Sequence, residues 1–167
     1  MSEYIELIGS NGVSLKLSLP IAKLCGTFVR MFEMTETPSL DDVPIKIPVP
    51  FILETIGGLL YDYLSFHQDN PEFSRYTTIG SHGNYMSTRF EQWKDSIITQ
   101  QDEAWVSAIS DPLVLHNLYS IADYLEIPSL MDLIAFNLST RLFEELYCSK
   151  PSNEKANYMR TILIGNV

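Results

Sequence analysis

The N-terminal segment, residues 5–19, constrains most tightly what this chain can fold into. Residues 5–8 and 13–19 alternate apolar and polar side chains, and Gly9-Ser10-Asn11-Gly12 separates the two runs. A period of two is typical of a strand with one buried face. Asn-Gly favours a tight turn because both residues tolerate positive φ. The sequence therefore predicts that the chain begins with a β-hairpin.

Helical periodicity replaces this alternation from Ile21 onward. Apolar residues recur at helical spacing up to Phe32, which predicts one helix that ends before the Thr37-Pro38 turn. Residues 43–50 then predict a short strand, and their prolines confine it to a sheet edge or to the ends of a strand. The pattern of the first 50 residues is thus hairpin, helix and edge strand.

The middle of the chain has two contrasting parts. Residues 51–64 predict a helix that contains Gly57-Gly58. Each glycine costs a helix about 1 kcal/mol relative to alanine, so we expect this pair to pack closely against a neighbouring helix. Residues 66–101 are rich in Ser, Thr, Asn, Gly and Gln and show no sustained apolar period before Phe90, which predicts a long insertion or loop.

Two apolar helices are predicted in the C-terminal third, one on each side of Pro128. Asp111 is a predicted N-cap, and Pro112 occupies the first helical position that proline favours. Because Pro128 disfavours helical geometry at the preceding residue, the first helix should end near Glu126 and the second should run over residues 129–146. A last short helix is predicted after Pro151-Ser152.

These two helices carry more apolar surface than one core-facing stripe requires. Helices that are apolar over more than one stripe lie centrally in a core or contact a partner with the second face. For Met131 and Ala135 both interpretations stay open. The excess apolar surface also predicts that the protein self-associates when it is free, because obligate interfaces resemble a core cut in half.

Composition narrows the classes of partner and compartment. The chain has 21 acidic and 11 basic residues and a net charge of −10, which repels nucleic acid and anionic membrane surfaces. Its apolar runs are interrupted well short of the roughly 20 residues that span a membrane. The sequence contains two cysteines and begins without the pattern of a signal peptide. We therefore expect a reducing compartment, cytoplasmic or nuclear, with both thiols free.

The sequence contains no recognisable constellation for catalysis. Its three histidines are scattered, no His/Cys pair has the spacing of a metal site, and the segment 80–83 is not a phosphate-binding loop. An enzyme that uses Cys25 or a histidine is the weakest interpretation, because neither Cys25 nor Cys148 has a His or Asn close in sequence. We expect no catalytic residue, no cofactor and no metal.

Five segments together resemble a known family. They are IELIGSNGVSLKLSL, IAKLCGTFVRMFE, VPIKIPVP, FILETIGGLLYDYL and LYSIADYLEIPSLMDLIAFNLSTRLF. In this order they are similar to the Skp and Elongin C adaptors of the BTB/POZ superfamily over nearly the whole chain. The most specific stretch is ADYLEIPSLMDL, which resembles the Ala-Asn-(Tyr or Phe)-Leu-Asp-Ile signature that joins two helices in these adaptors. The chain continues beyond it, as the Skp branch does.

The resemblance implies a fold and a function. The implied fold is α+β: a BTB/POZ fold over residues 1–127, with a small three-stranded sheet flanked by helices and an insertion at about 66–101. A Skp-like helical extension over residues 128–167 would follow. The implied function is that of a non-enzymatic adaptor linking an F-box-type protein to a cullin in a ubiquitin ligase complex. The alternative is a structural subunit of a larger assembly that holds an F-box-like segment without ligase activity.

The resemblance also assigns residues to two surfaces. Asp123 and Tyr124 match the cullin-facing positions, although Asp123 replaces the usual Asn. This substitution, together with a short C-terminal tail, favours the structural-subunit alternative. The residues that match the apolar groove for the F-box partner are Leu115, Tyr119, Met131, Ala135, Leu138, Leu142, Tyr158, Met159 and Ile162.

Overall fold

A computed structural model describes residues 4–34, 45–69 and 99–147, with side chains up to residue 142. The chain divides into two compact units. We call them the sheet unit, whose described residues are 4–34, 45–69 and 120–128, and the helical unit, whose described residues are 99–119 and 129–147. The predicted α+β class is confirmed, because the described residues form a three-stranded mixed sheet and six helices.

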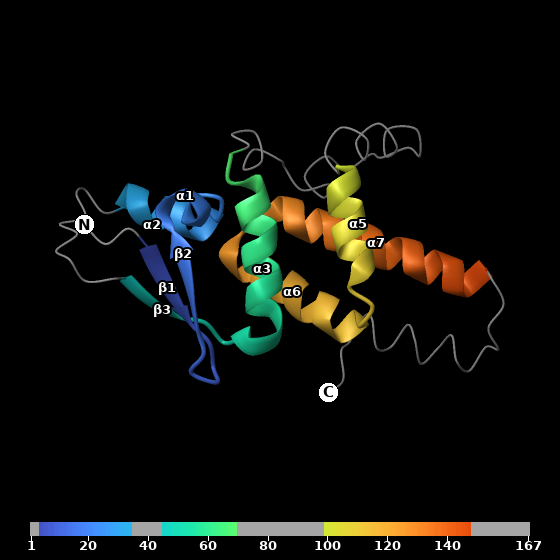
Figure 1. The fold of residues 1–167 in the computed structure, drawn as a ribbon, viewed down its shortest axis with the longest axis horizontal. Helices are drawn as coiled ribbons and strands as arrows, with labels where there is room; N and C mark the ends of the chain where they lie inside the picture. Colours follow the sequence, from blue (N-terminus) through green and yellow to red (C-terminus); the bar gives the residue numbers. More distant parts are fainter. Residues whose placement is uncertain (1–3, 35–44, 70–98, 148–167) are drawn as a thin grey trace. The chain divides into compact units, whose positions relative to one another are not determined.

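The sheet is built on the predicted hairpin. Strands β1 (Tyr4–Ile8) and β2 (Ser14–Ser18) pair antiparallel, with Ile5 opposite Leu17. Strand β3 (Ile45–Pro48) pairs parallel with β1, so the order is β2-β1-β3 (Figure 1). Strand β3 therefore lies at an edge, as its prolines predict.

The turn of the predicted hairpin contains one left-handed residue, Gly12. Gly12 has φ of 78°, and its N–H donates to the Gly9 carbonyl at 2.9 Å. Asn11 does not adopt positive φ, and its side-chain oxygen accepts a bond from the Val13 N–H at 3.3 Å. The turn is thus a three-residue loop that ends in a left-handed glycine, a common hairpin connection.

The single helix predicted from Ile21 is two helices, α1 (Leu19–Ala22) and α2 (Gly26–Met34). Between them the chain makes tight i→i+3 bonds, from the Leu24 N–H to the Ile21 carbonyl and from the Cys25 N–H to the Ala22 carbonyl. The Gly26 N–H bonds to the carbonyl of Glu126, far along the chain. The amide that would continue the first helix is therefore used by a tertiary contact.

Helix α3 (Leu53–His67) matches the helix predicted over 51–64, but its glycines have a different role from the expected one. Gly57 is buried, and a Cβ atom there would lie 3.9 Å from Leu15 of strand β2. Gly58 is exposed, and a Cβ atom on it would meet no atom within 4 Å among the described residues. The predicted helix–helix contact is wrong, since Gly57 approaches a strand and Gly58 faces open space.

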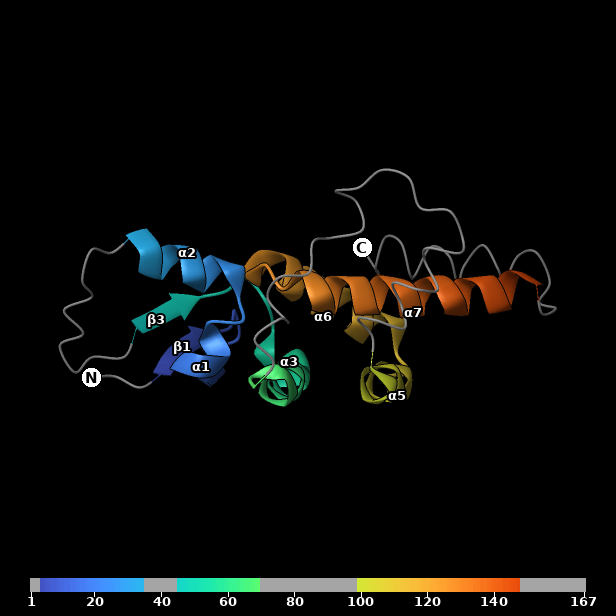
Figure 2. The same ribbon diagram turned by 90° about the horizontal axis from the view of Figure 1, so that it is seen from above.

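The helical unit contains α5 (Gln100–Ala108) and most of α7 (Pro128–Tyr147), which runs as one continuous helix (Figure 2). Helix α6 (Pro112–Leu125) contributes residues to both units. Thr99 and Asp102 form a reciprocal capping box at the start of α5. Residues 66–67 and 100–101 are helical, so the predicted insertion was too long at both ends; residues 70–98 lie outside the described part.

The predicted start and end of α6 are confirmed. Asp111 accepts a bond from the Leu113 N–H at 2.9 Å, and the helix begins at Pro112 and ends one residue before Glu126. Helix α7 spans 128–147 against the predicted 129–146. The short helix predicted after Pro151-Ser152 lies outside the described residues. Both boundaries follow from local signals, a capping aspartate and a proline.

Candidate interaction surfaces

Tyr124 and Asp123 lie exposed at the C-terminal end of α6. The Tyr124 side chain is 44% exposed, and its ring meets the Phe51 ring edge-on, with centroids 5.7 Å apart and an interplanar angle of 75°. Edge-to-face geometry of this kind fixes the direction of an aromatic ring. Tyr124 is therefore supported on one side and open on the other, beside the carboxylate of Asp123.

Directly after Tyr124 the chain makes a sharp corner, residues 124–127, which we call the Glu126 corner. Glu126 has φ of 56°, a left-handed conformation that costs a residue with a side chain roughly 1–2 kcal/mol. Its N–H donates to the Asp123 carbonyl, and the Ile127 N–H donates to the Ala122 carbonyl at 2.8 Å. These two bonds form a complete Schellman motif, a helix end that usually contains glycine at this position.

Helix α2 holds the Glu126 corner at three points. The Gly26 N–H donates to the Glu126 carbonyl at 3.0 Å, and the Thr27 hydroxyl donates to the Tyr124 carbonyl at 3.0 Å. The Glu126 carboxylate forms an ion pair with Arg30. These bonds satisfy backbone groups that helix ends otherwise leave without partners. The αL conformation of Glu126 is therefore maintained by tertiary contacts.

The second surface lies along α7. Four apolar residues at spacings of four, three and four share one flank of the helix, and we call them the α7 flank: Met131, Ala135, Leu138 and Leu142. Ala135 is exposed and the other three are half-buried, whereas a neighbouring stripe that includes Leu130, Leu133 and Ile134 is buried. For Met131 and Ala135 the sequence allowed both a core position and a partner-binding position. In this structure both residues are accessible to solvent.

The remaining residues assigned to the groove have different environments. Leu115 is fully buried, so it belongs to the chain's own interior and we remove it from the partner surface. Tyr119 is half-buried. Tyr158, Met159 and Ile162 lie outside the described residues. Of the predicted groove residues, the four on α7 are brought together on one flank of one helix.

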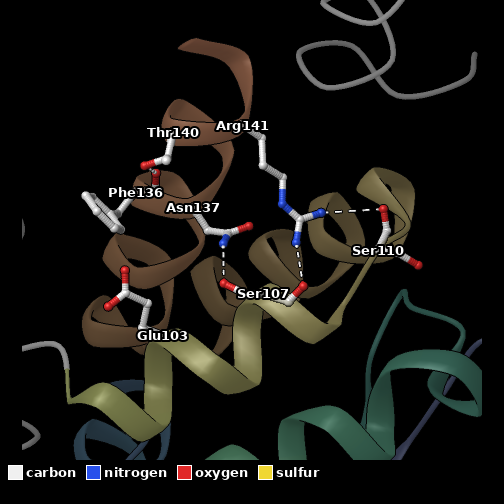
Figure 3. A pocket seen from close by; sticks show the side chains of 7 residues that line it. All are labelled: Glu103, Ser107, Ser110, Phe136, Asn137, Thr140 and Arg141. Atoms are coloured by element: carbon white, nitrogen blue, oxygen red, sulfur yellow. Dashed lines mark hydrogen bonds between the residues drawn. The ribbon is translucent and has the colours of Figure 1, made fainter. Parts of the chain in front are cut away.

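Residues of α5, of the segment after it and of α7 line an open pocket of about 450 Å³ (Figure 3). Arg141 reaches from α7 to the end of α5, where its guanidinium donates to the carbonyls of Val106, Ser107 and Ser110 at 3.2–3.4 Å. The Asn137 amide donates to the Ser107 hydroxyl at 3.4 Å. A cation that bonds the last carbonyls of a helix stabilises that helix end. The polar groups of this pocket thus serve the packing of α5 on α7.

Sequence reasoning missed the functions of Gly26, Glu126 and Arg141. The only local signal at the Glu126 corner is Pro128, which ends the helix but does not specify the conformation of Glu126. Gly26 and Arg141 act on residues about 100 and 35 positions away. No pattern within one element could have revealed these contacts.

The thiol of Cys25 is not activated as a nucleophile. Burial raises the pKa of the Cys25 thiol to about 12, so this thiol stays protonated near neutrality. The described residues contain no cluster of His, Cys, Asp or Glu that could hold a metal. Within the same ranges, no helix has the length and apolar character to cross a membrane.

Comparisons with known proteins leave the family unassigned. The chain matches no model of a known protein family and no curated protein. We therefore infer the function from the residues, the fold and the two surfaces of the chain itself.

Proposed function

We propose that this chain is a non-enzymatic adaptor with a BTB/POZ fold of the Skp type. It joins an F-box-type protein to a cullin in a ubiquitin ligase complex of the cytoplasm or nucleus. The fold supports this proposal through the order of its described elements: a hairpin, two helices, a parallel edge strand, the helices α3 and α5, and a helix pair that meets at the ADYLEIP segment.

The α7 flank is the observation that carries the proposal. Its apolar side chains lie beside a fully buried stripe of the same helix, so α7 contributes to the interior and still offers apolar surface outside. A partner's amphipathic helix can pack on such a flank, with anchors at spacings of three and four residues. Ala135 lies at its centre, where a small side chain lets a partner backbone approach closely.

Tyr124 supplies the proposed cullin contact. It is an exposed aromatic side chain at a corner held by backbone bonds, and aromatic anchors of this kind often dominate the energy of an interface. Asp123 lies exposed beside it and adds a negative charge. A cullin surface that accepts this corner should therefore place a hydrogen-bond donor or a basic side chain opposite Asp123.

The alternative function is that of a structural subunit that holds an F-box-like segment without ligase activity. The exposed carboxylate of Asp123 favours it, because the family signature has an uncharged Asn there. The α7 flank has the same use in both cases. Only cullin binding separates them.

A matched pair of charge substitutions tests the groove. Ala135→Arg places a guanidinium on the α7 flank, and a buried, unpaired charge costs an interface several kcal/mol. Ala104→Arg makes the same change at an exposed position on helix α5. Proteins that co-purify with each tagged full-length variant are identified by mass spectrometry, and circular dichroism confirms the fold.

We expect both variants to fold and only Ala135→Arg to lose the F-box-type partner. A folded Ala135→Arg protein that keeps its partner at full strength would contradict the groove assignment. Tyr124→Lys, in the same assay, should remove a cullin and leave the F-box-type partner bound. Wild-type protein that captures an F-box-type partner and no cullin would favour the structural subunit.

A further inference from the structure

We propose that α2 is the positioning element of the cullin-facing surface: Gly26, Thr27 and Arg30 lock the Glu126 corner and thereby fix how Tyr124 is presented. The identity of the partner rests on the function proposed above. The lock itself rests on contacts within the sheet unit, where all of these residues lie. The proposal assigns to α2 a role that does not require α2 to touch the partner.

The three contacts of the lock fix the backbone conformation of residues 124–126 rather than the rotamer of one side chain. Two of them end on backbone carbonyls, that of Tyr124 and that of Glu126, which flank Leu125. The third ends on the Glu126 carboxylate, through the ion pair with Arg30. Because Leu125 is fully buried, the corner is fixed from inside by this side chain and from α2 by the three contacts.

The lock counteracts a local preference. Glu126 occupies the left-handed region, which residues other than glycine rarely adopt. The ends of helices also open more readily than their centres when tertiary contacts are absent. Without its contacts to α2, the last turn of α6 would relax, and Tyr124 lies in that turn. The ring direction set by Phe51 would then no longer be maintained.

Gly26 is the residue that makes the close approach possible. A Cβ atom at this position would lie 2.9 Å from a Glu126 carboxylate oxygen, 3.0 Å from the Glu126 Cβ and 3.2 Å from the Glu126 carbonyl oxygen. Gly26 does not have positive φ, so glycine is required here for space and not for its conformation. Alanine would suit the start of a helix better than glycine. Damage from alanine must therefore come from the contact with Glu126.

This geometry gives a test with a built-in rescue. Gly26→Ala should displace the corner, and adding Glu126→Gly should restore it. Two of the three close contacts then disappear, and glycine accepts the left-handed conformation, which offsets the loss of the solvent-exposed ion pair with Arg30. Gly58→Ala is the matched control, since its new methyl group meets no described atom. All variants are made in the full-length chain.

Two readouts separate positioning from general stability. Nuclear magnetic resonance of tyrosine-labelled protein follows the Tyr124 ring signal, assigned with Tyr124→Phe, because the Phe51 ring shifts it. Affinity for a purified cullin is measured on the same samples. We expect Gly26→Ala to move the Tyr124 signal and to weaken cullin binding at least tenfold with unchanged circular dichroism. The double variant should reverse both effects, and Gly58→Ala should cause neither.

Each result decides the proposal. A Tyr124 signal that does not move in Gly26→Ala overturns the lock, and so does a moved signal with unchanged cullin affinity. If Gly26→Ala fails to fold, Thr27→Val removes only the hydroxyl donor to the Tyr124 carbonyl and should move the same signal. If the wild type binds no cullin, the proposed function fails, while the tyrosine signal and its rescue still decide whether α2 positions the corner.

Discussion

The sheet unit and the helical unit fill their interiors with different kinds of side chain. In the described part of the sheet unit, His67 is the one buried polar residue, among apolar residues such as Phe28 and Leu60. The described part of the helical unit buries four polar or charged residues: Asp102, Ser129, Asp132 and Asn137. Asp102 caps α5, and the Asn137 amide bonds the Ser107 hydroxyl of α5.

The two units differ outside as well. In the helical unit, polar residues lie in the interior and the apolar α7 flank lies at the solvent-accessible surface. The sheet unit presents Tyr124 at a corner that hydrogen bonds hold in place. The polarity of a side chain therefore does not by itself show whether that side chain lies in the interior or at a binding surface. Chemical labelling and substitutions in the two interiors test this difference.

The largest expected effect concerns the apolar interior of the sheet unit, probed through Cys25. Burial raises the pKa of this thiol from 9.0 to about 12. At pH 8 its thiolate fraction is therefore about a thousandfold lower than that of an ordinary thiol. In a Cys148→Ser variant, which leaves Cys25 as the only cysteine, we expect alkylation to be slower than in the unfolded chain by at least that factor.

The same pKa shift gives a dependence on pH. Because the folded pKa of Cys25 is higher than the unfolded one, the unfolded chain loses this proton first as pH rises. The stability contribution of the neutral thiol is complete below pH 9.0 and is lost between 9.0 and about 12. Cys25→Ala should remove this contribution, so the denaturation midpoint of the variant should fall less between pH 9.0 and about 12 than that of the wild type. Stoichiometric labelling of folded protein at pH 8 would contradict the apolar interior.

The next effect compares two leucines of the helical unit. Leu115 is fully buried and Leu138 lies half-buried on the α7 flank. Leu115→Ala should lower the free energy of unfolding by about 2–5 kcal/mol, because it leaves a cavity. Leu138→Ala should lower it by about 1 kcal/mol or less and weaken partner binding instead. Urea denaturation and co-purification measure the two quantities, and equal losses of stability would show that the α7 flank is interior.

The smallest effect concerns the polar interior of the helical unit. The Asn137 side-chain oxygen is buried and forms no hydrogen bond with the described residues. Asn137→Leu keeps a similar shape and removes this desolvated acceptor, so the free energy of unfolding should stay unchanged or rise by about 1 kcal/mol. Its bond partner Ser107 is exposed and can bond water. A loss of more than about 2 kcal/mol would show that the amide is required for packing α5 on α7.

Local signals predicted the elements that depend on neighbours in sequence. The alternation around Gly9 to Gly12 predicted the hairpin, Asp111 the start of α6, and Pro128 the division between α6 and α7. Capping, turn and proline effects act within a few residues, so they can be read from the sequence. The split between α1 and α2 was missed because a bond from Gly26 to the distant Glu126 helps to produce it.

The candidate surfaces were predicted in part. Helical spacing grouped Met131, Ala135, Leu138 and Leu142, but spacing alone could not decide whether this flank or the neighbouring stripe faces inward. The same limitation placed Leu115 on the partner surface although it is fully buried. Burial depends on which elements pack together, and several of these contacts join residues 30 or more positions apart.

The hairpin, the edge position of β3 and the limits of α6 and α7 could be predicted from the sequence, because each depends on bonds or steric limits between nearby residues. The conformation of the Glu126 corner depends on contacts between distant residues. There Thr27 bonds a carbonyl 97 residues away, and Gly26 leaves room for Glu126. A left-handed glutamate is locally unfavourable, so it persists only where contacts from another part of the chain offset its cost.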